Sequence, residues 1–336
     1  MKIAVVHNRY GAPLCRFGTP TKEMYAEKQV IGVRDILREA GYEVEILEGD
    51  ISLFSRLNEF MPACANSGKP TGMVFNMSYG LQGEQRYTHI PAMLEMAGIP
   101  YTGSSPLGHA LALDKVVAKR LFVEAGLPTP EYRMMDSIMD WGKPLKFPLV
   151  VKPKHESTSY GLHLVRDLME LDLAVADIRS RFLQSALVEE FIEGREFCVG
   201  ILGNGAGAIT LPVCELEFGD RELRMNTFDD KYRRSGNEPT KVCPANIDET
   251  LADQLSKLSL SVFRTCHLRD YARVDFRVSQ DGNPYILEVN SMASLGHNGS
   301  YVASARAMGL TPDQLILQIV KVARQRIEFS EQTLEV

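Results

Sequence analysis

The sequence predicts a protein of mixed α/β and α+β class, in which an N-terminal open parallel sheet precedes two α+β domains. Its 336 residues are too many for one ordinary core and correspond to two or three domains of about 100–150 residues each. Apolar strands alternate with helices up to residue 103, which is the pattern of a parallel sheet, and from Ser104 onward helices and hairpins dominate. We therefore expect an N-terminal domain at 1–103, a small central domain at 104–186 and a C-terminal domain at 187–336.

The composition is that of a soluble globular protein, with 45% hydrophobic and 24% charged residues. A net charge of −6 and an isoelectric point near 5.7 argue against a general surface for nucleic acid or anionic membranes. The first residues lack the apolar core of a signal peptide, and no stretch approaches the roughly 18 apolar residues of a membrane helix. The six cysteines form no C-x-x-C pair and are interpreted as reduced thiols. We expect a cytoplasmic protein whose partners are small molecules, with neither nucleic acid nor membrane among them.

The first two domains are predicted from the alternation of apolar segments and amphipathic stretches. The predicted strands are 3–8, 42–47, 72–77, 99–101, 147–153 and 161–165. The predicted helices are 21–40, 88–97, 106–113, 115–125 and 167–182. Thr19 or Thr21 is expected to cap the first helix. Ligands bind at the carboxyl ends of strands in open parallel sheets, which indicates the loops 8–20 and 78–86 as binding segments.

The C-terminal domain is predicted to contain two hairpins and two long loops. Its segments are a strand within 187–194, a hairpin at Asn204-Gly205, a loop 218–245, a helix 248–267, a hairpin 271–290 and a loop 291–300. The last helix is expected to begin at Thr311-Pro312, with Thr311 as its N-cap and proline in its first turn.

The hairpin at 271–290 is the most informative of these segments. It reads as two strands joined by a tight turn at Asp281-Gly282, which is a strong hairpin signal. With those two residues at the turn, the cross-strand pairs are Val278–Tyr285, Asp275–Glu288 and Arg273–Asn290. Paired residues point to the same side of a sheet, so one face of the hairpin is apolar and the other is charged.

The charged face of the hairpin indicates a metal site. Asp275 and Glu288 lie opposite each other and repel unless a positive charge sits between them. Together with Asn290 they offer hard oxygen donors, which suit Mg²⁺ better than a soft metal. The alternative is a solvated polar face on which Arg273 and Arg277 neutralise the carboxylates.

Other residues could bind a nucleotide, although each also has an ordinary explanation. Lys152 ends an apolar strand before the polar loop 154–160, which could fold its backbone N–H groups over phosphates or form a plain surface hairpin. Acidic residues beside an apolar strand could accept hydrogen bonds from adenine and ribose or be merely solvated. These residues are Glu189, Glu190 and Glu196, beside Phe191 and Ile192. No Walker motif, dinucleotide-binding glycine pattern or nucleophile elbow occurs.

Several motifs occur in a fixed order between about residues 72 and 310. The most specific is Ala272-Arg273-Val274-Asp275-Phe276 followed by Leu287-Glu288-Val289-Asn290. The others are Gly98–Ser104, Ala112–Lys115, Val151–Pro153, Val188–Phe191, Gly194–Glu196 and Lys231-Tyr232. This ordered set resembles the ATP-grasp enzymes and, within them, the D-alanine–D-alanine ligase family, whose pattern A-R-V-D-F…E-x-N the first motif matches in residue type and spacing.

The resemblance implies an ATP-grasp fold, with two α+β domains enclosing ATP, and an ATP- and Mg²⁺-dependent ligase that joins amino acids and releases ADP and phosphate. The implied ATP-binding residues are Lys115, Lys152, Glu189, Glu190, Phe191, Ile192, Glu196 and Lys231. The implied ligands of two Mg²⁺ ions, or of Mn²⁺ in their place, are Asp275, Glu288 and Asn290. The implied catalytic residues are Arg273, Lys231, Glu84 and Ser159. The implied substrate contacts are Glu84, Tyr232, Arg273, Gly296 and Ser300, and the family further implies a homodimer.

The implied chemistry is physically reasonable. A carboxylate is a poor electrophile, so ATP phosphorylates it, metal ions neutralise the moving phosphoryl group, and an amine then displaces phosphate. The loops 154–160 and 218–245 are expected to close over the site and exclude water from the acyl phosphate.

Departures from the family pattern lie mainly in segments that contact amino acids. The family's G-G-x-S-x-E after the first strand is replaced by Asn8–Pro13, and its H-G-x-x-G-E reads Tyr79–Glu84 and lacks the histidine. Its phosphate loop S-S-V-G reads Thr158–Gly161, and the segment after E-x-N reads Ser291–Ser300. We therefore expect ATP-dependent ligation with an unassigned pair of substrates. Two other hypotheses stay open: a genuine D-alanine–D-alanine ligase of peptidoglycan synthesis, and a catalytically silent nucleotide-binding regulator.

Overall fold

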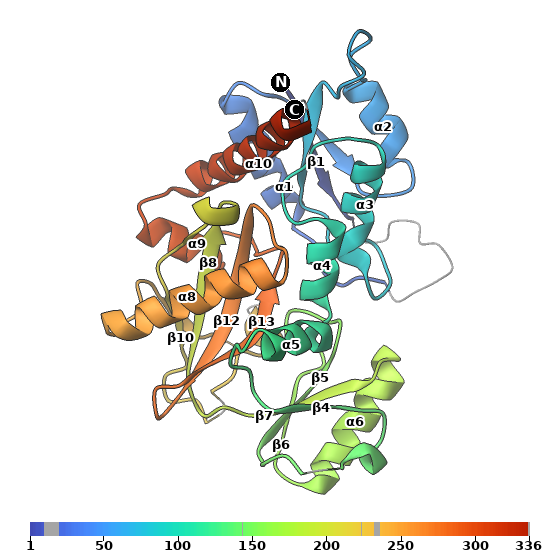
Figure 1. Cartoon of the computed structure of the whole chain (residues 1–336). Helices are drawn as coiled ribbons and strands as arrows, with labels where there is room; N and C mark the ends of the chain where they lie inside the picture. The colour runs from blue at the N-terminus through green and yellow to red at the C-terminus, as the bar shows by residue number, and fades with distance from the viewer. Residues whose placement is uncertain (10–19, 143, 223, 232–235, 335–336) are drawn as a thin grey trace.

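A computed structural model describes residues 1–9, 20–142, 144–222, 224–231 and 236–334 of the chain. Three β-sheets organise these residues, and they follow one another from top to bottom in Figure 1. One sheet is parallel and two are antiparallel, which confirms the predicted mixture of α/β and α+β architecture.

The strands and helices have the following bounds. The strands are β1 (Lys2–His7), β2 (Glu43–Glu48), β3 (Gly72–Asn76), β4 (Tyr132–Met135), β5 (Leu149–Pro153), β6 (His163–Val165), β7 (Ala186–Glu190), β8 (Gly194–Leu202), β9 (Ile209–Thr210), β10 (Cys214–Glu217), β11 (Thr240–Val242), β12 (Tyr271–Ser279) and β13 (Pro284–Asn290). The α-helices are α1 (Glu27–Glu39), α2 (Leu53–Phe60), α3 (His89–Met96), α4 (Pro106–Leu113), α5 (Lys115–Glu124), α6 (Leu168–Phe182), α7 (Phe228–Lys231), α8 (Glu249–Thr265), α9 (Ser300–Ala307) and α10 (Pro312–Leu334). Within the described residues, none of these helices is both long and apolar enough to cross a membrane.

The N-terminal sheet has the order β2-β1-β3, and all its strands are parallel. The predicted strand at 99–101 is reduced to a single parallel bridge between Tyr101 and Val74. Residues of α2 and α3 pack against one face of the sheet, and residues of α1 and α10 pack against the other. Helices thus cover both faces of the sheet. The carboxyl ends of its strands remain the edge at which a ligand is expected.

The first helix begins later than the sequence predicts. Ala26 is its N-cap residue, and the side-chain oxygen of Gln29 accepts a hydrogen bond from the Ala26 backbone N–H. Thr21 does not cap this helix, because its hydroxyl accepts from Glu23 N while its own N–H donates to Leu81 O. Thr19, the other predicted cap, lies outside the described residues. Thr21 therefore joins a segment that precedes the helix and contacts the loop after β3.

The small central sheet is antiparallel, with the order β4-β7-β5-β6. Asp167 caps α6 by accepting a hydrogen bond from Glu170 N. Leu171, Val175, Ile178 and Phe182 recur at helical spacing and are buried against the strands. The helix α6 therefore covers one face of this sheet. The opposite face is available to line the cavity described below.

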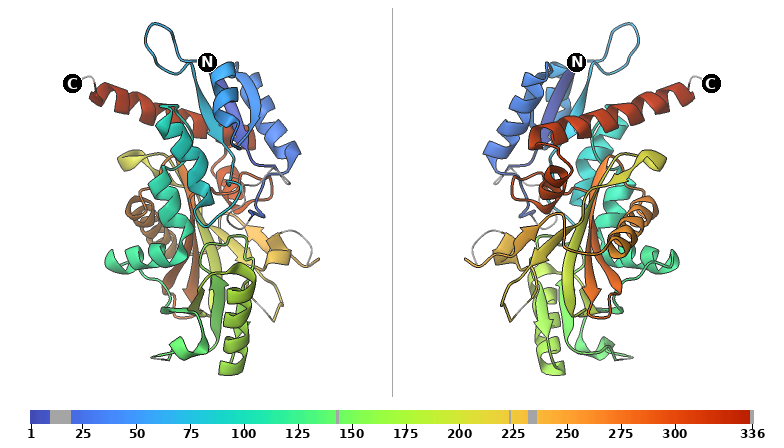
Figure 2. Two further views of the ribbon diagram at one scale, coloured as in Figure 1. Left: turned by 90° about the vertical axis from the view of Figure 1, so that its right-hand side faces the viewer. Right: turned by 90° about the vertical axis from the view of Figure 1, so that its left-hand side faces the viewer.

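The C-terminal sheet has the order β11-β10-β8-β12-β13, and β9 pairs with β8. The apolar residues of β8, β12 and β13 pack against α8 and α5 in one buried cluster. The segment that includes β10, α7 and β11 projects on the side away from α8, as Figure 2 shows in both views. The charged face of β12 and β13 lies on that same side.

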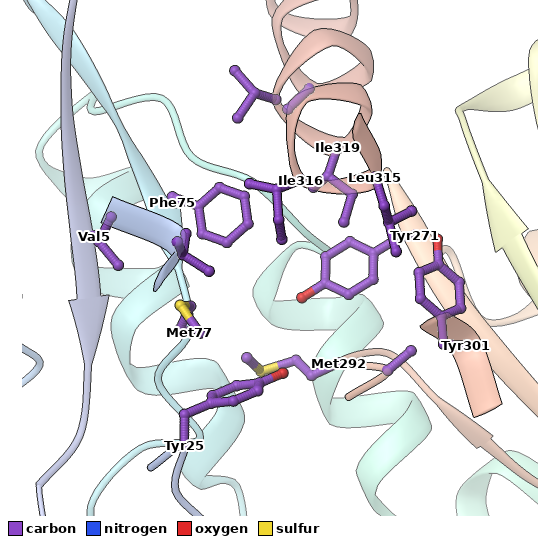
Figure 3. Close-up of a cluster of buried hydrophobic side chains, with 14 of the residues drawn as sticks. Val5, Tyr25, Phe75, Met77, Tyr271, Met292, Tyr301, Leu315, Ile316 and Ile319 are labelled. Atoms are coloured by element: carbon purple, nitrogen blue, oxygen red, sulfur yellow. The ribbon is translucent and has the colours of Figure 1, made fainter. Parts of the chain in front are cut away.

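The last helix returns to the N-terminal sheet. Thr311 caps α10 as predicted, because its hydroxyl accepts a hydrogen bond from Gln314 N. Ile316 and Ile319 of this helix share a buried cluster with Phe75 of β3 and Tyr271 of β12 (Figure 3). Each such side chain contributes about 1.5–3 kcal/mol by its removal from water. This cluster joins the first sheet to the hairpin 271–290.

The register of that hairpin is partly as predicted. Asp275 pairs with Glu288, and Arg273 pairs with Asn290. Val278 pairs with Pro284 in place of Tyr285, because the register shifts after Asp275. The turn is also longer than predicted, with Ser279 N donating to Asn283 O. A β-bulge therefore absorbs one residue on the turn side of the charged pair.

Candidate active site

One large cavity, of about 1010 Å³, brings together nearly all the residues that the sequence singled out. The predicted residues that line it are Lys115, Lys152, Ser159, Glu189, Glu190, Phe191, Ile192, Glu196, Lys231, Arg273, Asp275, Glu288, Asn290, Gly296 and Ser300. They come from the strands β5, β7, β8, β12 and β13, from the helices α5, α7 and α9, and from the loops between these elements. Glu84 is not among the lining residues, and Tyr232 lies outside the described residues. The volume is ample for a nucleotide with a second small molecule.

The strands β12 and β13 form a charged floor to this cavity. Arg273 donates to both carboxylate oxygens of Asp275, at 2.6 and 2.7 Å. Asn290 Nδ2 donates to Asp275 Oδ2 at 3.0 Å, which leaves its own Oδ1 as an acceptor. Lys115 Nζ lies 3.7 Å from Glu288 Oε2. Arginine and lysine therefore offset the repulsion between Asp275 and Glu288.

The alternative of a solvated, arginine-neutralised face holds only in part. Arg273 does pair with Asp275, but Arg277 pairs with Glu196, at 3.3 Å, and not with either floor carboxylate. Burial by itself raises the pKa of Glu288, yet the charges of Lys115 and the neighbouring lysines outweigh burial and hold this pKa well below its usual range. Glu288 is therefore ionised at neutral pH, and the floor keeps its negative charge.

The floor fits a hard divalent cation. Two carboxylates and one amide oxygen are the donors that Mg²⁺ prefers, and the cavity has room for water and phosphate oxygens to complete its coordination. Within the described residues, no group of three or more His, Cys, Asp or Glu side chains could hold a metal ion. A metal ion on this floor would therefore take its third protein ligand from the amide of Asn290.

Three lysines converge on the cavity from different elements. Lys115 is the first residue of α5, and Asp114 caps that helix by accepting from Val116 N and Val117 N at 2.9 and 3.0 Å. Lys115 Nζ donates to the carbonyl of Glu156, at the edge of the polar loop 154–160. Lys152 lies on β5 and Lys231 ends α7. Three ammonium groups in one acidic protein form a local anion site.

A fourth lysine, Lys119, was missed by the sequence analysis. Its side chain is fully buried in α5, and Nζ lies 2.9 Å from Glu189 Oε2. The other oxygen of Glu189 is paired with Lys152. Burial lowers the pKa of Lys119 to about 8, although the charge of Glu189 opposes this shift. Nothing in the sequence distinguished Lys119 from an ordinary solvated lysine on a helix.

The segment between β7 and β8 forms the far wall of the cavity. The side chain of Glu190 accepts from Lys146 N at 2.9 Å, so one of its oxygens is engaged outside the cavity. Arg277 stacks over the ring of Phe191, 4.5 Å from its centroid. Burial raises the pKa of Glu196 to about 7, against the opposing charges of Arg277 and Lys231. This wall presents backbone groups, an aromatic ring and a carboxyl group, which suit a base and a ribose.

The two loops expected to close over the site are in contact. Ser159 Oγ donates to the carbonyl oxygen of Asn226 at 2.7 Å. The rings of Tyr160 and Phe228 lie 5.2 Å apart. Lys22, from the segment before α1, donates to the hydroxyl of Tyr160. The loops 154–160 and 218–245 therefore meet above the floor, with the N-terminal segment against them.

Glu23 is a second residue that the sequence analysis missed. Its side chain is buried and lines the cavity, and Oε2 accepts from Arg86, at 3.0 Å, and from the hydroxyl of Tyr87, at 2.7 Å. The family pattern has a glutamate soon after the first strand, which this chain lacks at Asn8–Pro13. Glu23 lies farther along the sequence and brings a carboxylate to the cavity. Tyr79, which replaces the family's histidine, stacks on Tyr25 with 5.3 Å between ring centroids.

Glu84, Gly296 and Ser300 are the remaining predicted contacts to the substrates. Glu84 has a side chain that is 58% exposed, with Oε2 3.7 Å from Nδ1 of His155, so its predicted role stays a prediction. Ser300 is buried at the start of α9. A Cβ on Gly296 would lie 2.8 Å from Gln29 Nε2, so this glycine allows the loop 291–300 to approach α1 closely.

Comparisons with known proteins agree with this geometry. A family model described as the D-ala D-ala ligase C-terminus matches residues 121–321. An uncharacterized protein, y4sG, of Sinorhizobium fredii is 43% identical over 97% of this chain and 98% of its own length. A D-alanine–D-alanine ligase of Aquifex aeolicus is 33% identical over 86% of this chain and 92% of its own length. The crystal structure of the D-alanine–D-alanine ligase from Bacillus anthracis complexed with ATP has a TM-score of 0.71 at 21% identity, covering 98% of this chain and 99% of that one.

Proposed function

This chain belongs to the D-alanine–D-alanine ligase family, with the ATP-grasp fold, and we propose that it joins two amino acids, or an amino acid and another small acid, through an acyl phosphate. Family membership makes it an ATP-dependent ligase that forms C–N bonds. The observation that carries the proposal is the floor of Asp275, Glu288 and Asn290 facing Lys115, Lys152 and Lys231 in one cavity.

ATP binding is assigned to the space between the central and C-terminal sheets. The base lies against the segment Glu189–Ile192, and Glu196 holds the ribose. Lys115, Lys152 and Lys231 bind the phosphate oxygens. Lys152 pairs with Glu189 in this structure, so it exchanges that partner for phosphate when ATP binds, while Lys119 continues to neutralise Glu189. This exchange avoids leaving a buried carboxylate without a counter-charge.

The phosphoryl transfer takes place over the floor. Asp275, Glu288 and Asn290 would hold two Mg²⁺ ions, and these would supply positive charge to the β- and γ-phosphate oxygens. Lys231 contacts the γ-phosphate from α7. Arg273 lies beside Asp275, at 2.6 Å, and is placed to stabilise charge on the acyl phosphate and on the tetrahedral intermediate. The amine then attacks the acyl carbon, and phosphate leaves with the C–O bonding electrons.

The loops protect the acyl phosphate from water. The contact of Ser159 with Asn226 joins the loop 154–160 to the segment that carries Lys231. A closed pair of loops excludes water and holds Lys231 over the phosphates. In this proposal the predicted domains 104–186 and 187–336 supply the two walls. Domain 1–103 and the loop 291–300 supply the residues that meet the amino acids. A cytoplasmic location and a homodimer remain predictions.

The amino acids are assigned to the part of the cavity lined by Glu23, Tyr87 and the loop 291–300. Within the described part of the chain, both hydrogen bonds to the carboxylate of Glu23 end on Oε2, which leaves Oε1 for an ammonium or hydroxyl group of the first substrate. Gly296 and Ser300 lie where the second substrate would enter. Tyr79, which lines this region, stands where the family pattern has histidine, so the substrate pair is not assigned to D-alanine.

A second candidate function is D-alanine–D-alanine ligase itself, which the names of the relatives from Aquifex aeolicus and Bordetella avium carry. Rescue of a bacterial strain that lacks this activity would favour it. A silent nucleotide-binding regulator is disfavoured, because the metal floor and three lysines are retained together.

The acyl-phosphate step is tested by isotope transfer. An amino-acid mixture labelled with ¹⁸O in its carboxyl groups is incubated with ATP, Mg²⁺ and the enzyme. The proposal predicts that one ¹⁸O atom appears in the released phosphate for each bond formed. Label found only in AMP would assign an adenylate route and contradict the proposal.

A further inference from the structure

Three cysteines form a row across the C-terminal sheet. Cys198 of β8 pairs in register with Cys214 of β10. The last recorded pair between β10 and β11 is Glu215 with Val242, and one further step brings Cys243 opposite Cys214. Residues paired in this way point to the same side of the sheet. The three thiols are therefore neighbours on one face.

This row continues into the metal floor. On the other side of Cys198, the register pairs it with Asp275 of β12, which in turn pairs with Glu288. Cys198 also lines the cavity. The cysteines Cys214 and Cys243 stand at the two ends of the segment that carries Lys231, because β10 leads into this segment and β11 leads out of it.

The three thiols differ in access to solvent. Cys214 is fully buried and Cys198 is 3% exposed, whereas Cys243 is half-buried. Cys243 Sγ lies 3.5 Å from the carbonyl of Val213 and 3.7 Å from Ser304 Oγ. Within the described part of the chain the thiols do not belong to any group that could hold a metal ion. A half-buried thiol can meet an oxidant, and a buried thiol beside it can then form a disulfide with it.

We propose that Cys243 and Cys214 are a modification site, which a peroxide converts into a disulfide at the base of the segment that carries Lys231. The thiolate of Cys243 attacks one peroxide oxygen, the O–O bond breaks, and hydroxide leaves while a sulfenic acid forms. The thiol of Cys214 then attacks the sulfenic sulfur, and water leaves as the S–S bond forms. Two thiols lose two electrons in total, and the peroxide gains them.

The electrostatics agree with these two roles. A hydrogen bond with Cys214 lowers the pKa of Cys243 below the usual range for a thiol. Hydrogen bonds with Cys198 and Cys243 raise the pKa of Cys214. Cys243 is therefore the thiol that ionises first and reacts with the oxidant, and Cys214 is the thiol that resolves the sulfenic acid.

The disulfide has a consequence for the site. A disulfide holds its two sulfur atoms about 2.05 Å apart, so it would fix β10 and β11 to each other at this point. Because β10 pairs with β8 at Cys198 and β8 pairs with β12 at Asp275, we expect this constraint to affect the floor. We expect oxidation to lower turnover reversibly, an expectation that rests on the proposed ligase function.

The test uses the full chain with Cys15 and Cys64 replaced by serine, so that the buried Cys266 is the one remaining thiol outside the row. Hydrogen peroxide is added, and peptides are mapped without reduction. We expect one new linkage, between Cys214 and Cys243, which Cys243→Ser abolishes and the matched variant Cys198→Ser retains. In Cys214→Ser, a sulfenic acid trapped by dimedone should lie on Cys243. A linkage between Cys198 and Cys214, or dimedone on another thiol, overturns the assignment, as does the absence of any linkage.

Turnover is measured separately on the reduced and oxidised proteins. Loss of amino-acid-dependent ADP release on oxidation, restored by dithiothreitol, supports the coupling to the site. A disulfide that forms with unchanged turnover overturns that coupling. The peptide map needs no substrate, so failure of the disulfide is distinguishable from failure of the proposed ligase activity.

Discussion

Lys119 and Glu189 form an ion pair with 2.9 Å between Nζ and Oε2, and both side chains are buried. Thr129 Oγ1 lies 2.6 Å from the same ammonium group. The second oxygen of Glu189 is paired with Lys152. A single carboxylate therefore holds two lysines, of which only Lys152 lines the cavity. We therefore expect Lys119 to act through Glu189 and to position Lys152.

Replacing Lys119 by methionine should weaken ATP binding. Without Lys119, the buried carboxylate of Glu189 keeps Lys152 as its only counter-ion, and Lys152 is less available to phosphate. Removing one partner of a buried pair also destabilises the protein, by about 3 kcal/mol. We expect a higher KM for ATP with a smaller change in kcat. The control is Lys257→Met, at an exposed pair with Asp253. Equal ATP kinetics for both variants would contradict the positioning role.

Asp114 should couple the stability of α5 to nucleotide binding. Its side chain accepts from two N–H groups at the start of the helix, next to Lys115. Asp114→Ala should lower the free energy of unfolding by at least about 1 kcal/mol and raise the KM for ATP, because Asp114 Oδ2 also lies 2.9 Å from Nε2 of the buried His155. Asp248→Ala removes an N-cap from α8, away from the cavity. In urea unfolding the first variant should lose at least as much stability as the second, and only the first should bind ATP less well.

The hairpin 271–290 shows how far sequence reasoning reaches. The alternation of side chains fixes which residues share a face, so the pairs Asp275–Glu288 and Arg273–Asn290 could be predicted. The pair Val278–Tyr285 was wrong, because a β-bulge depends on local backbone geometry that the side-chain pattern does not encode.

Lys119 and Glu23 could not be predicted for a different reason. A lysine inside a helix and a glutamate before one are ordinary surface residues by type and spacing. Only tertiary packing buries Lys119 against β7 and brings Glu23 to Arg86 and Tyr87. The residues predicted to bind ATP and metal ions were singled out because several motifs occur together in a fixed order, whereas isolated residues carry no such signal.

Glu196 should make stability depend on pH. Burial raises its pKa to about 7 in the folded protein, against 4.5 for an exposed glutamate. Between these two values the folded state binds a proton that the unfolded state has lost, so stability falls as pH rises through the window. Urea unfolding without metal ions should show this fall in the wild type and not in Glu196→Gln. The same slope in both proteins would contradict the shift.

Glu23 should affect the amino-acid substrate and spare ATP. A hydrogen bond to a charged group contributes about 1.5–3 kcal/mol, so Glu23→Gln should raise the KM for one amino acid by roughly 10- to 100-fold. Glu27→Gln, an exposed residue in the first turn of α1, is the matched control. A rise in the KM for ATP alone would place Glu23 outside the amino-acid site.

The most direct test of the ligase assignment is product release from ATP across a panel of D- and L-amino acids, with the wild type and with Asp275→Asn. We predict that the wild type releases ADP and phosphate only when the right acids are present, with one amide bond formed per ATP. Asp275→Asn should retain its fold by circular dichroism and lose turnover by about 10²–10³-fold or more, since the floor loses a charge that holds the metal ions. Release of AMP and pyrophosphate, or hydrolysis that does not depend on any amino acid, would contradict the assignment.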